Sequence, residues 1–138
     1  MAYIYRQKLN LSELVDLPKI SRRVVVYEPN DYLGALYRHY LRAHNFDVKH
    51  CPDLLLLKET VAAFAPGLLV FCADAGRTGV ILKNFSQNFP SLKIVTTAYN
   101  LNQEEVSSLM AFGVQSHINR RFSRPQDLVL LARTLIDN

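Results

Sequence analysis

The stretch Leu68-Leu69-Val70-Phe71-Cys72 decides the fold of this chain. It is a short, continuous apolar run, which is typical of a strand that is buried on both faces of a parallel sheet. Pro66 and Gly67 come directly before it and end the preceding helix, because proline disfavours helical geometry in the residue before it. We therefore expect this strand to lie in the centre of a sheet that is covered by helices.

Short apolar runs alternate with longer helical segments on both sides of this strand. The other predicted strands are residues 23–27, 46–48, 94–97 and 114–118. Apolar residues three or four positions apart predict helices within residues 33–41, 52–64, 80–85, 100–110 and 125–135. This repeated β/α order predicts an α/β fold in which crossover helices cover a parallel sheet.

Polar residues and glycine predict where some of these helices begin and end. Asn30 or Asp31 is suited to cap the first helix. Asn100, with Gln103 three residues later, resembles a capping box for the fourth helix. Gly113 then supplies the stop at the C-terminal end of that helix.

Length, charge and cysteine content fit a single soluble domain with reduced cysteines. A chain of 138 residues is sized for a single core. Its net charge of +4 is too small and too dispersed for a nucleic-acid arm or a polybasic membrane anchor. No apolar run approaches the roughly 18 residues that span a bilayer. We expect a cytoplasmic protein in which Cys51 and Cys72 are reduced and at least partly buried.

Residues 1–21 lie outside the β/α pattern. The segment is too apolar for a disordered tail, since it contains Tyr3, Ile4, Tyr5, Leu9, Leu11, Leu14, Val15 and Leu17. We predict that it packs on the domain formed by residues 22–138 or on a partner.

Five β/α units of this size, with Glu28 after the first strand and Thr97-Ala98 ending the fourth, resemble the receiver domain of two-component response regulators. The resemblance to these CheY-like domains covers roughly residues 22–137. It is carried, in chain order, by residues 24–28, residues 66–72, Gly79, Thr97-Ala98, Gly113 and residues 120–122. It implies a flavodoxin-like (βα)5 three-layer sandwich with strand order 2-1-3-4-5, and a role in two-component signalling or a phosphorelay.

The residues that carry the phosphoryl chemistry of the family are largely replaced. The resemblance implies that the two acidic metal ligands correspond to Glu28 and Pro29, the phosphoryl-accepting aspartate to Cys72, the phosphoryl-contacting threonine to Thr97, the lysine to Arg120, and the aromatic switch residue to His117. Only the threonine is retained. The sequence therefore indicates a degenerate pseudo-receiver that lacks the phosphoacceptor aspartate.

A charge count supports the loss of the metal. The family pocket holds three carboxylates and one lysine, a net charge of about −2 that a divalent cation offsets. Here Glu28 and Arg120 sum to zero. We predict that these two side chains approach each other at the carboxyl edge of the sheet, with Thr97 nearby, and that no metal is needed.

Two alternative functions remain open at this stage. Asp74 is a displaced phosphoacceptor in the first, with Glu28 as a remnant metal ligand and Thr97 assisting. In the second, Cys72 near Arg120 is a redox-sensing thiol, although free cysteines at such positions are more often buried packing residues. No cofactor is expected, because the loop after the first strand offers flavin phosphate two carboxylates and a proline without an N–H.

The last helix indicates a partner surface. The stripe of this helix that faces the core is formed by Leu128, Leu131, Ala132 and Leu135. We expect three further apolar residues, near Arg133, to add exposed apolar surface on its other faces: Val129, Leu130 and Ile136. We therefore predict a non-enzymatic protein–protein interaction module that works without phosphorylation. It would bind a protein partner or a second copy through the fourth helix, fifth strand and fifth helix. Nucleic acid, small-molecule substrates and membranes are not expected partners.

Overall fold

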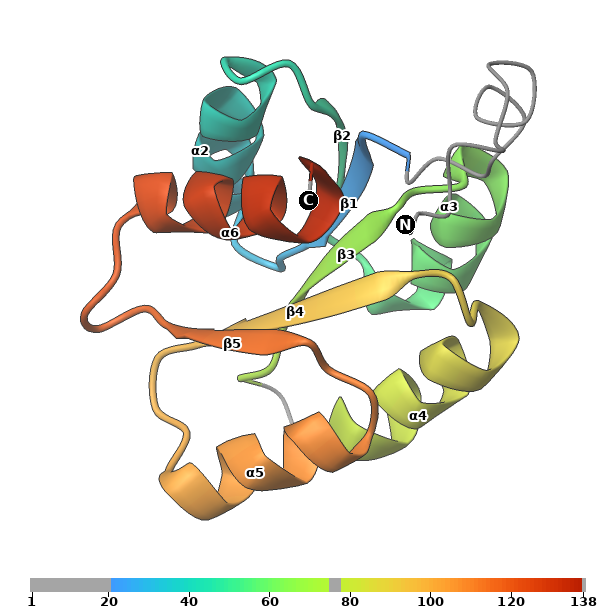
Figure 1. Ribbon diagram of the computed structural model, residues 1–138, viewed down its shortest axis with the longest axis vertical. Coiled ribbons are helices and arrows are strands. Elements are labelled where there is room, and N and C mark those ends of the chain that lie inside the picture. Colours follow the sequence, from blue (N-terminus) through green and yellow to red (C-terminus); the bar gives the residue numbers. More distant parts are fainter. Residues whose placement is uncertain (1–20, 75–77, 138) are drawn as a thin grey trace, which may run out of the picture.

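The structure, a computed structural model, describes residues 21–74 and 78–137 (Figure 1). Five parallel strands form one sheet in the order β2-β1-β3-β4-β5, which confirms the predicted fold. The strands are β1 (Arg23–Tyr27), β2 (Asp47–Cys51), β3 (Leu68–Cys72), β4 (Lys93–Ala98) and β5 (Ser116–Asn119). The helices are α2 (Asp31–Arg42), the 3-10 turn η1 (Leu54–Leu56), α3 (Leu57–Phe64), α4 (Thr78–Asn88), α5 (Gln103–Ala111) and α6 (Pro125–Asp137).

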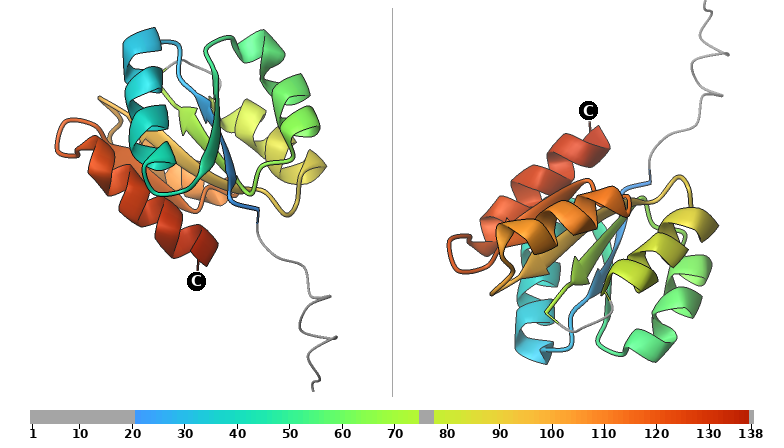
Figure 2. Two further views of the ribbon diagram at one scale, coloured as in Figure 1. Left: turned by 90° about the horizontal axis from the view of Figure 1, so that it is seen from above. Right: turned by 90° about the horizontal axis from the view of Figure 1, so that it is seen from below.

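The helices cover the sheet from both sides, in three layers (Figures 1 and 2). Helices α2 and α6 bury one apolar core against the sheet, which includes Tyr37, Leu41 and Leu128. Helices α3, α4 and α5 bury a second core on the other face, which includes Val61 and Leu82. No helix within the described residues is long and apolar enough to cross a membrane.

Strand β3 is central, as the sequence predicts. All five of its residues are buried, and it pairs with β1 on one side and β4 on the other. Strand β2 lies at one edge and is longer than the predicted residues 46–48. It extends to Cys51 because it pairs with the whole of β1, from Arg23 beside Asp47 to Tyr27 beside Cys51.

Helix α5 and strand β5 begin later than predicted. The capping box is formed by Asn102 and Glu105, two residues beyond the predicted pair. Gly113 adopts a φ of 94°, as a C-terminal stop requires. The backbone N–H of Val114 then bonds back to the carbonyl of Leu109, so that Val114 closes the helix and β5 begins only at Ser116.

The second predicted helix is divided in two. Asp53 caps the turn η1, and α3 begins at Leu57. Leu57 and Val61, one helical turn apart, are the residues of α3 that enter the core. Leu56 is 51% exposed, because it stands one position outside that spacing.

The prediction that Val129 and Ile136 add exposed apolar surface is wrong. Val129 is 3% and Ile136 is 7% exposed, and both belong to the core that α2 and α6 share. Helix α6 contacts α2 as well as the sheet, so its buried stripe is wider than one neighbour alone would require. Leu130, which is 62% exposed, and Arg133 remain at the surface.

Candidate functional site

The candidate site lies at the carboxyl edge of the sheet. Glu28 directly follows β1, Cys72 ends β3, and Arg120 directly follows β5. Parallel strands end at the same edge, so residues that are far apart in the sequence come together there. This edge is also where doubly wound α/β folds place their ligand sites.

Arg120 and Glu28 form a buried ion pair, which confirms the predicted approach of these residues. The Nη1 atom of Arg120 donates a hydrogen bond to Oε1 of Glu28 at 2.8 Å. The side chains are 15% and 4% exposed, respectively. The second carboxylate oxygen of Glu28 accepts a hydrogen bond from the backbone N–H of Asn30 at 3.0 Å. Both oxygens of Glu28 are therefore already bonded within the protein.

Asp74 completes the site as a second acidic partner of Arg120. The Nη2 atom of Arg120 donates to Oδ2 of Asp74, while Oδ1 accepts a hydrogen bond from the backbone N–H of Tyr99 at 2.9 Å. One guanidinium thus joins two carboxylates, and the three charges sum to −1 rather than to zero. The sequence signal for this contact was the position of Asp74 two residues after the central strand, which we interpreted only as that of a displaced phosphoacceptor.

The guanidinium remains charged in this setting. Burial acts to lower the pKa of Arg120, but the acidic groups around it, Asp74 first among them, raise that pKa overall. Arg120 is therefore a fixed cation between two carboxylates at every physiological pH.

Cys72 lies beside this pair as a buried thiol. It is 5% exposed, and burial raises the pKa of its thiol to about 11. Its Sγ atom is 3.9 Å from Nη1 of Arg120 and donates to Oδ2 of Asp74 at 3.7 Å. Because the thiolate is the reactive form, a pKa this high leaves the thiol inert at neutral pH.

Thr97 and Pro29 occupy the remaining predicted pocket positions. Thr97 is 1% exposed and pairs with Cys72 in the register of β3 and β4, so it lies next to the site within the sheet. Pro29 is exposed in the loop after β1 and has no side-chain donor for a metal. Of the predicted pocket residues, Arg120 contacts both Glu28 and Cys72, Thr97 adjoins Cys72, and Pro29 contributes no ligand.

The donor set does not fit Mg²⁺. This cation requires near-octahedral oxygen ligands, and Arg120 occupies one oxygen of each of the two carboxylates. The residue at the remaining family position is a thiol, which is a soft ligand. Among residues 21–74 and 78–137, no group of three or more His, Cys, Asp and Glu side chains is placed to hold a metal ion.

His117 forms its hydrogen bond with a neighbouring strand and not with the ion pair. Its Nδ1 atom lies 2.8 Å from Oγ1 of Thr96, a threonine that is fully buried in β4. Burial lowers the pKa of His117, although the charge of Asp74 acts in the opposite direction. The imidazole is thus a neutral partner of Thr96. The sequence alone did not reveal this hydrogen bond, because it joins two strands.

His50 of β2 contacts the backbone of Glu28. Its Nε2 atom donates to the backbone carbonyl of Glu28 at 2.8 Å, since a carbonyl oxygen can only accept. The ring lies directly against Gly34 of α2, where a Cβ atom would come within 2.1 Å of Nε2. A glycine inside a helix was the sequence signal for this close approach. His50 therefore fixes the backbone that carries Glu28.

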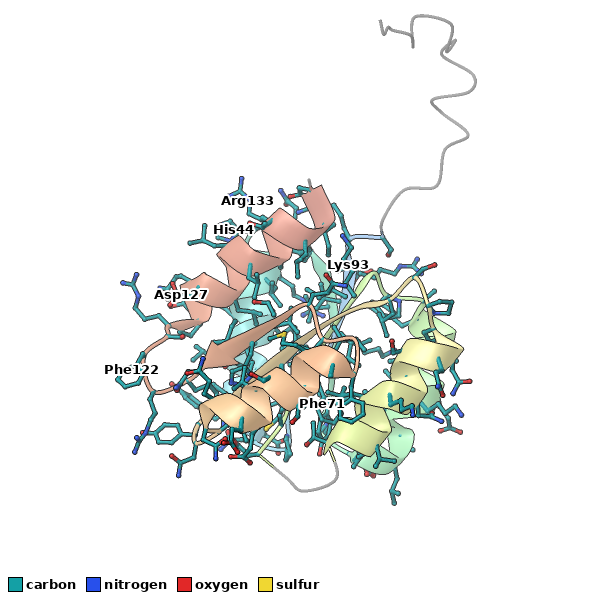
Figure 3. All side chains as sticks on the ribbon, turned by 60° about the horizontal axis from the view of Figure 1, so that its bottom comes forward. His44, Phe71, Lys93, Phe122, Asp127 and Arg133 are labelled. Carbon is teal, nitrogen blue, oxygen red and sulfur yellow. The ribbon has the colours of Figure 1, made fainter. Side chains whose placement is uncertain are left out.

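A pocket adjoins the ion pair, and aromatic side chains are exposed in the loops that follow β4 and β5. The pocket has a volume of about 310 Å³ and is lined by Tyr37, Tyr99, Arg120 and Arg124, among others. Burial raises the pKa of Tyr37 to about 12, so this tyrosine is a neutral phenol. Phe122, in the loop between β5 and α6, is 84% exposed and projects from the domain (Figure 3). The guanidinium of Arg121 lies 5.4 Å from the ring of Tyr99.

Known sequences give little guidance. No family model matches the chain. A curated relative, a putative uncharacterized transmembrane protein of Dictyostelium discoideum, is 28% identical over 102 residues, which is 71% of this chain. The chain spans only about 2% of the length of that protein.

The fold of the chain closely matches the folds of solved structures, although their sequences are only 13–17% identical to it. An orphan response regulator of H. pylori superposes with a TM-score of 0.78 at 17% identity, covering 86% of this chain and 99% of that one. A response regulator from Thermotoga maritima gives 0.79 at 13% identity, with the same coverage. An atypical orphan response regulator, described with a phosphorylation-independent regulatory mechanism, gives 0.75 at 16% identity and covers 83% of this chain and 95% of its own. The chain therefore has the fold of response regulator receiver domains.

Proposed function

We propose that this protein is a pseudo-receiver, a signalling regulator that acts as a phosphorylation-independent protein–protein interaction module and not as an enzyme. The observation that carries the proposal is the contact of Arg120 with both Glu28 and Asp74, beside Cys72 at the position of the family's acceptor. The guanidinium provides inside the protein the positive charge that a metal supplies in the family. A site whose two carboxylates are already paired with an internal cation does not depend on a phosphoryl group to complete it.

The proposed partner surface is the face formed by α5, β5 and α6. Its exposed apolar residues within the described chain are Tyr99, Met110, Phe122 and Leu130, with exposed fractions of 53%, 38%, 84% and 62%. Arg121, which lies over the ring of Tyr99, and Arg133 of α6 are also exposed. Aromatic side chains and arginine are enriched where proteins bind each other, and an exposed apolar group of this kind favours a protein partner. We propose a cytoplasmic protein partner, with a second copy of the chain as the alternative.

The likeness to an atypical orphan regulator supports this direction. That protein is described as having a phosphorylation-independent regulatory mechanism. At 16% identity the likeness extends to the fold, so the function of the present chain rests on its own replaced pocket residues.

A working phosphoacceptor at Asp74 is the second candidate. Its side chain is 37% exposed at the mouth of the site, so a phosphodonor can reach it. Against it, Arg120 and the N–H of Tyr99 already bond both carboxylate oxygens. No comparable support exists for redox sensing by Cys72, because its thiol is buried and its pKa is raised.

Intact-mass measurement after treatment with acetyl phosphate and Mg²⁺ separates these two functions. We expect no addition of a phosphoryl group to the full chain. An added phosphoryl group that disappears in Asp74→Asn but persists in the matched exposed variant Asp53→Asn would overturn the proposal in favour of the phosphoacceptor.

A further inference from the structure

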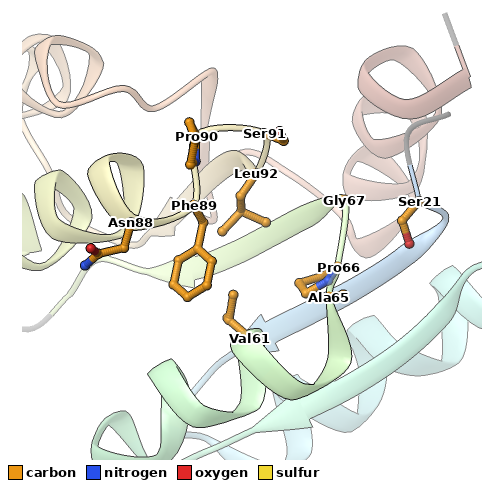
Figure 4. Close-up of a pocket in the computed structure, with 10 residues that line it drawn as sticks. All are labelled: Ser21, Val61, Ala65, Pro66, Gly67, Asn88, Phe89, Pro90, Ser91 and Leu92. Atoms are coloured by element: carbon orange, nitrogen blue, oxygen red, sulfur yellow. The ribbon is translucent and has the colours of Figure 1, made fainter. Parts of the chain in front are cut away.

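A second pocket lies at the opposite, amino edge of the sheet (Figure 4). It has a volume of about 600 Å³, nearly twice that of the pocket beside Arg120. Phe89 and Leu92, from the turn between α4 and β4, lie across it from Val61 and Pro66, at the end of α3. This pocket takes no part in the site described above, because the two occupy opposite ends of the strands.

The pocket is apolar and uncharged. Val61 at its base is 2% exposed, and Phe89 and Leu92 are partly buried against the core of α3, α4 and α5. None of the ten residues that line it carries a charge. The polar side chains among them, Ser21, Asn88 and Ser91, are small and neutral. The chemistry of this lining fits aliphatic side chains rather than an ionic ligand or a metal.

The chain enters the domain at this same pocket. Ser21 lines the pocket, and β1 begins two residues later. The segment before Ser21 lies outside the described residues, and its sequence is rich in aliphatic side chains, with Leu9, Leu11, Leu14, Val15 and Leu17. Seven residues span at most about 25 Å, so the segment from Leu14 to Ile20 is long enough to return to any part of the pocket.

We propose that this pocket is an intramolecular docking site for the N-terminal segment, and that it receives the aliphatic side chains around Leu14 and Leu17. The pocket needs an apolar, uncharged occupant, and Leu14 and Leu17 are apolar residues tethered within seven residues of Ser21 at its edge. A short tether gives an effective concentration on the order of millimolar, so that even a weak apolar contact is occupied. The docking is independent of the proposed partner surface, which lies on α5, β5 and α6.

A single tryptophan reports on the docking, because the chain contains none. In the full-length Leu17→Trp variant, we expect fluorescence emission at shorter wavelength than a solvated tryptophan and several-fold protection from acrylamide quenching. Emission and quenching equal to those of free tryptophan would overturn the proposal.

A matched pair of charge variants tests whether the pocket is the site. Ser91→Glu, made in the Leu17→Trp chain, places a carboxylate on the exposed rim of the pocket, whereas Gln87→Glu places the same charge on exposed α4 outside it. We expect Ser91→Glu to increase quenching several-fold and Gln87→Glu to leave it unchanged. An equal response in the two variants would overturn the proposal.

Protein concentration distinguishes the occupants of the pocket. Docking within one chain predicts the same protection at low and high micromolar concentration. Protection that appears only at high concentration would assign the pocket to a second copy and overturn the intramolecular site. Either result leaves the phosphorylation test of the proposed function unaffected, because that test concerns the other edge of the sheet.

Discussion

Nη1 of Arg120 lies 2.8 Å from Oε1 of Glu28, although β3 and β4 separate the strands that these two residues follow. The contact joins the ends of β1 and β5 over the carboxyl edge of the central strands. Asp74, after β3, bonds to the same guanidinium. Three of the five strands are thus linked through one side chain.

Removal of this side chain should destabilise the protein strongly. Arg120→Met leaves Glu28 as a buried, uncompensated carboxylate, which typically costs about 3–5 kcal/mol. The double variant with Glu28→Gln should lose less, because the buried carboxylate is then absent and only Asp74, whose side chain is 37% exposed, has lost its partner. Urea unfolding measures both free energies. Equal losses in the single and double variants would contradict a charge-based role for the pair.

Magnesium should not bind at the carboxyl edge. Arg120 already occupies one oxygen of each carboxylate there, so millimolar Mg²⁺ with a phosphate mimic should leave the amide NMR signals of Glu28, Thr97 and Arg120 in place. Large shifts confined to these residues would show that the cation displaces the guanidinium. A titration with Na⁺ at matched ionic strength is the control for general salt effects.

Cys72 should react slowly with thiol reagents in the folded protein. A shift of the pKa from 9.0 to about 11 lowers the thiolate fraction at neutral pH about a hundredfold, before burial limits access further. The rate of iodoacetamide modification in a Cys51→Ala background isolates this thiol. The same protein in urea provides the reference rate. Rapid modification under native conditions would restore the redox-sensing hypothesis.

His117 should make the stability depend on pH below neutrality. Burial lowers the pKa of the folded-state imidazole below 6.5, so the unfolded chain binds a proton at a pH where the folded chain does not. The contribution of His117 is therefore complete above about pH 6.5 and is lost as the pH falls through the lowered pKa. Each unit of pKa shift corresponds to about 1.4 kcal/mol.

The comparison of wild type with His117→Asn isolates this contribution, because His39, His44 and His50 are present in both proteins. We expect the stability advantage of the wild type to shrink between pH 7 and pH 5. An advantage that stays constant or grows on acidification would contradict the assigned protonation state.

Aspartate substitutions at Leu130 and Val129, two neighbouring residues of α6, should have opposite effects on folding stability and on association. Leu130→Asp changes an exposed side chain and should alter the unfolding free energy by less than about 0.5 kcal/mol, while weakening partner binding or self-association. Val129→Asp buries a charge and should cost more than about 3 kcal/mol. Sedimentation and urea unfolding report the two effects. If Leu130→Asp leaves every association of the protein intact, α6 is not part of the partner surface.

The sequence predicted the strand positions well because a doubly buried strand such as β3 has a pattern of its own, whereas the strand order was implied by the resemblance to receiver domains. It also predicted the Glu28–Arg120 pair, since residues that follow parallel strands meet at one edge. The contact of Asp74 with Arg120 was missed, because the sequence does not determine where a loop carboxylate points. Val129 and Ile136 were placed wrongly for a related reason. The width of a buried helix stripe depends on whether a second helix packs beside it, and sequence periodicity does not show that α2 does so.

The contact between His50 and Gly34 links two positions that lie on different elements and 16 residues apart. Any side chain at position 34 would enter the space of the imidazole ring, so a larger residue there is compatible only with a smaller one at position 50. The two positions should therefore covary among related chains. In a relative that has lost both the glycine and the histidine, another donor has to bond the backbone carbonyl of the residue after β1. The presence of both residues therefore marks chains that hold this part of the site as the present chain does.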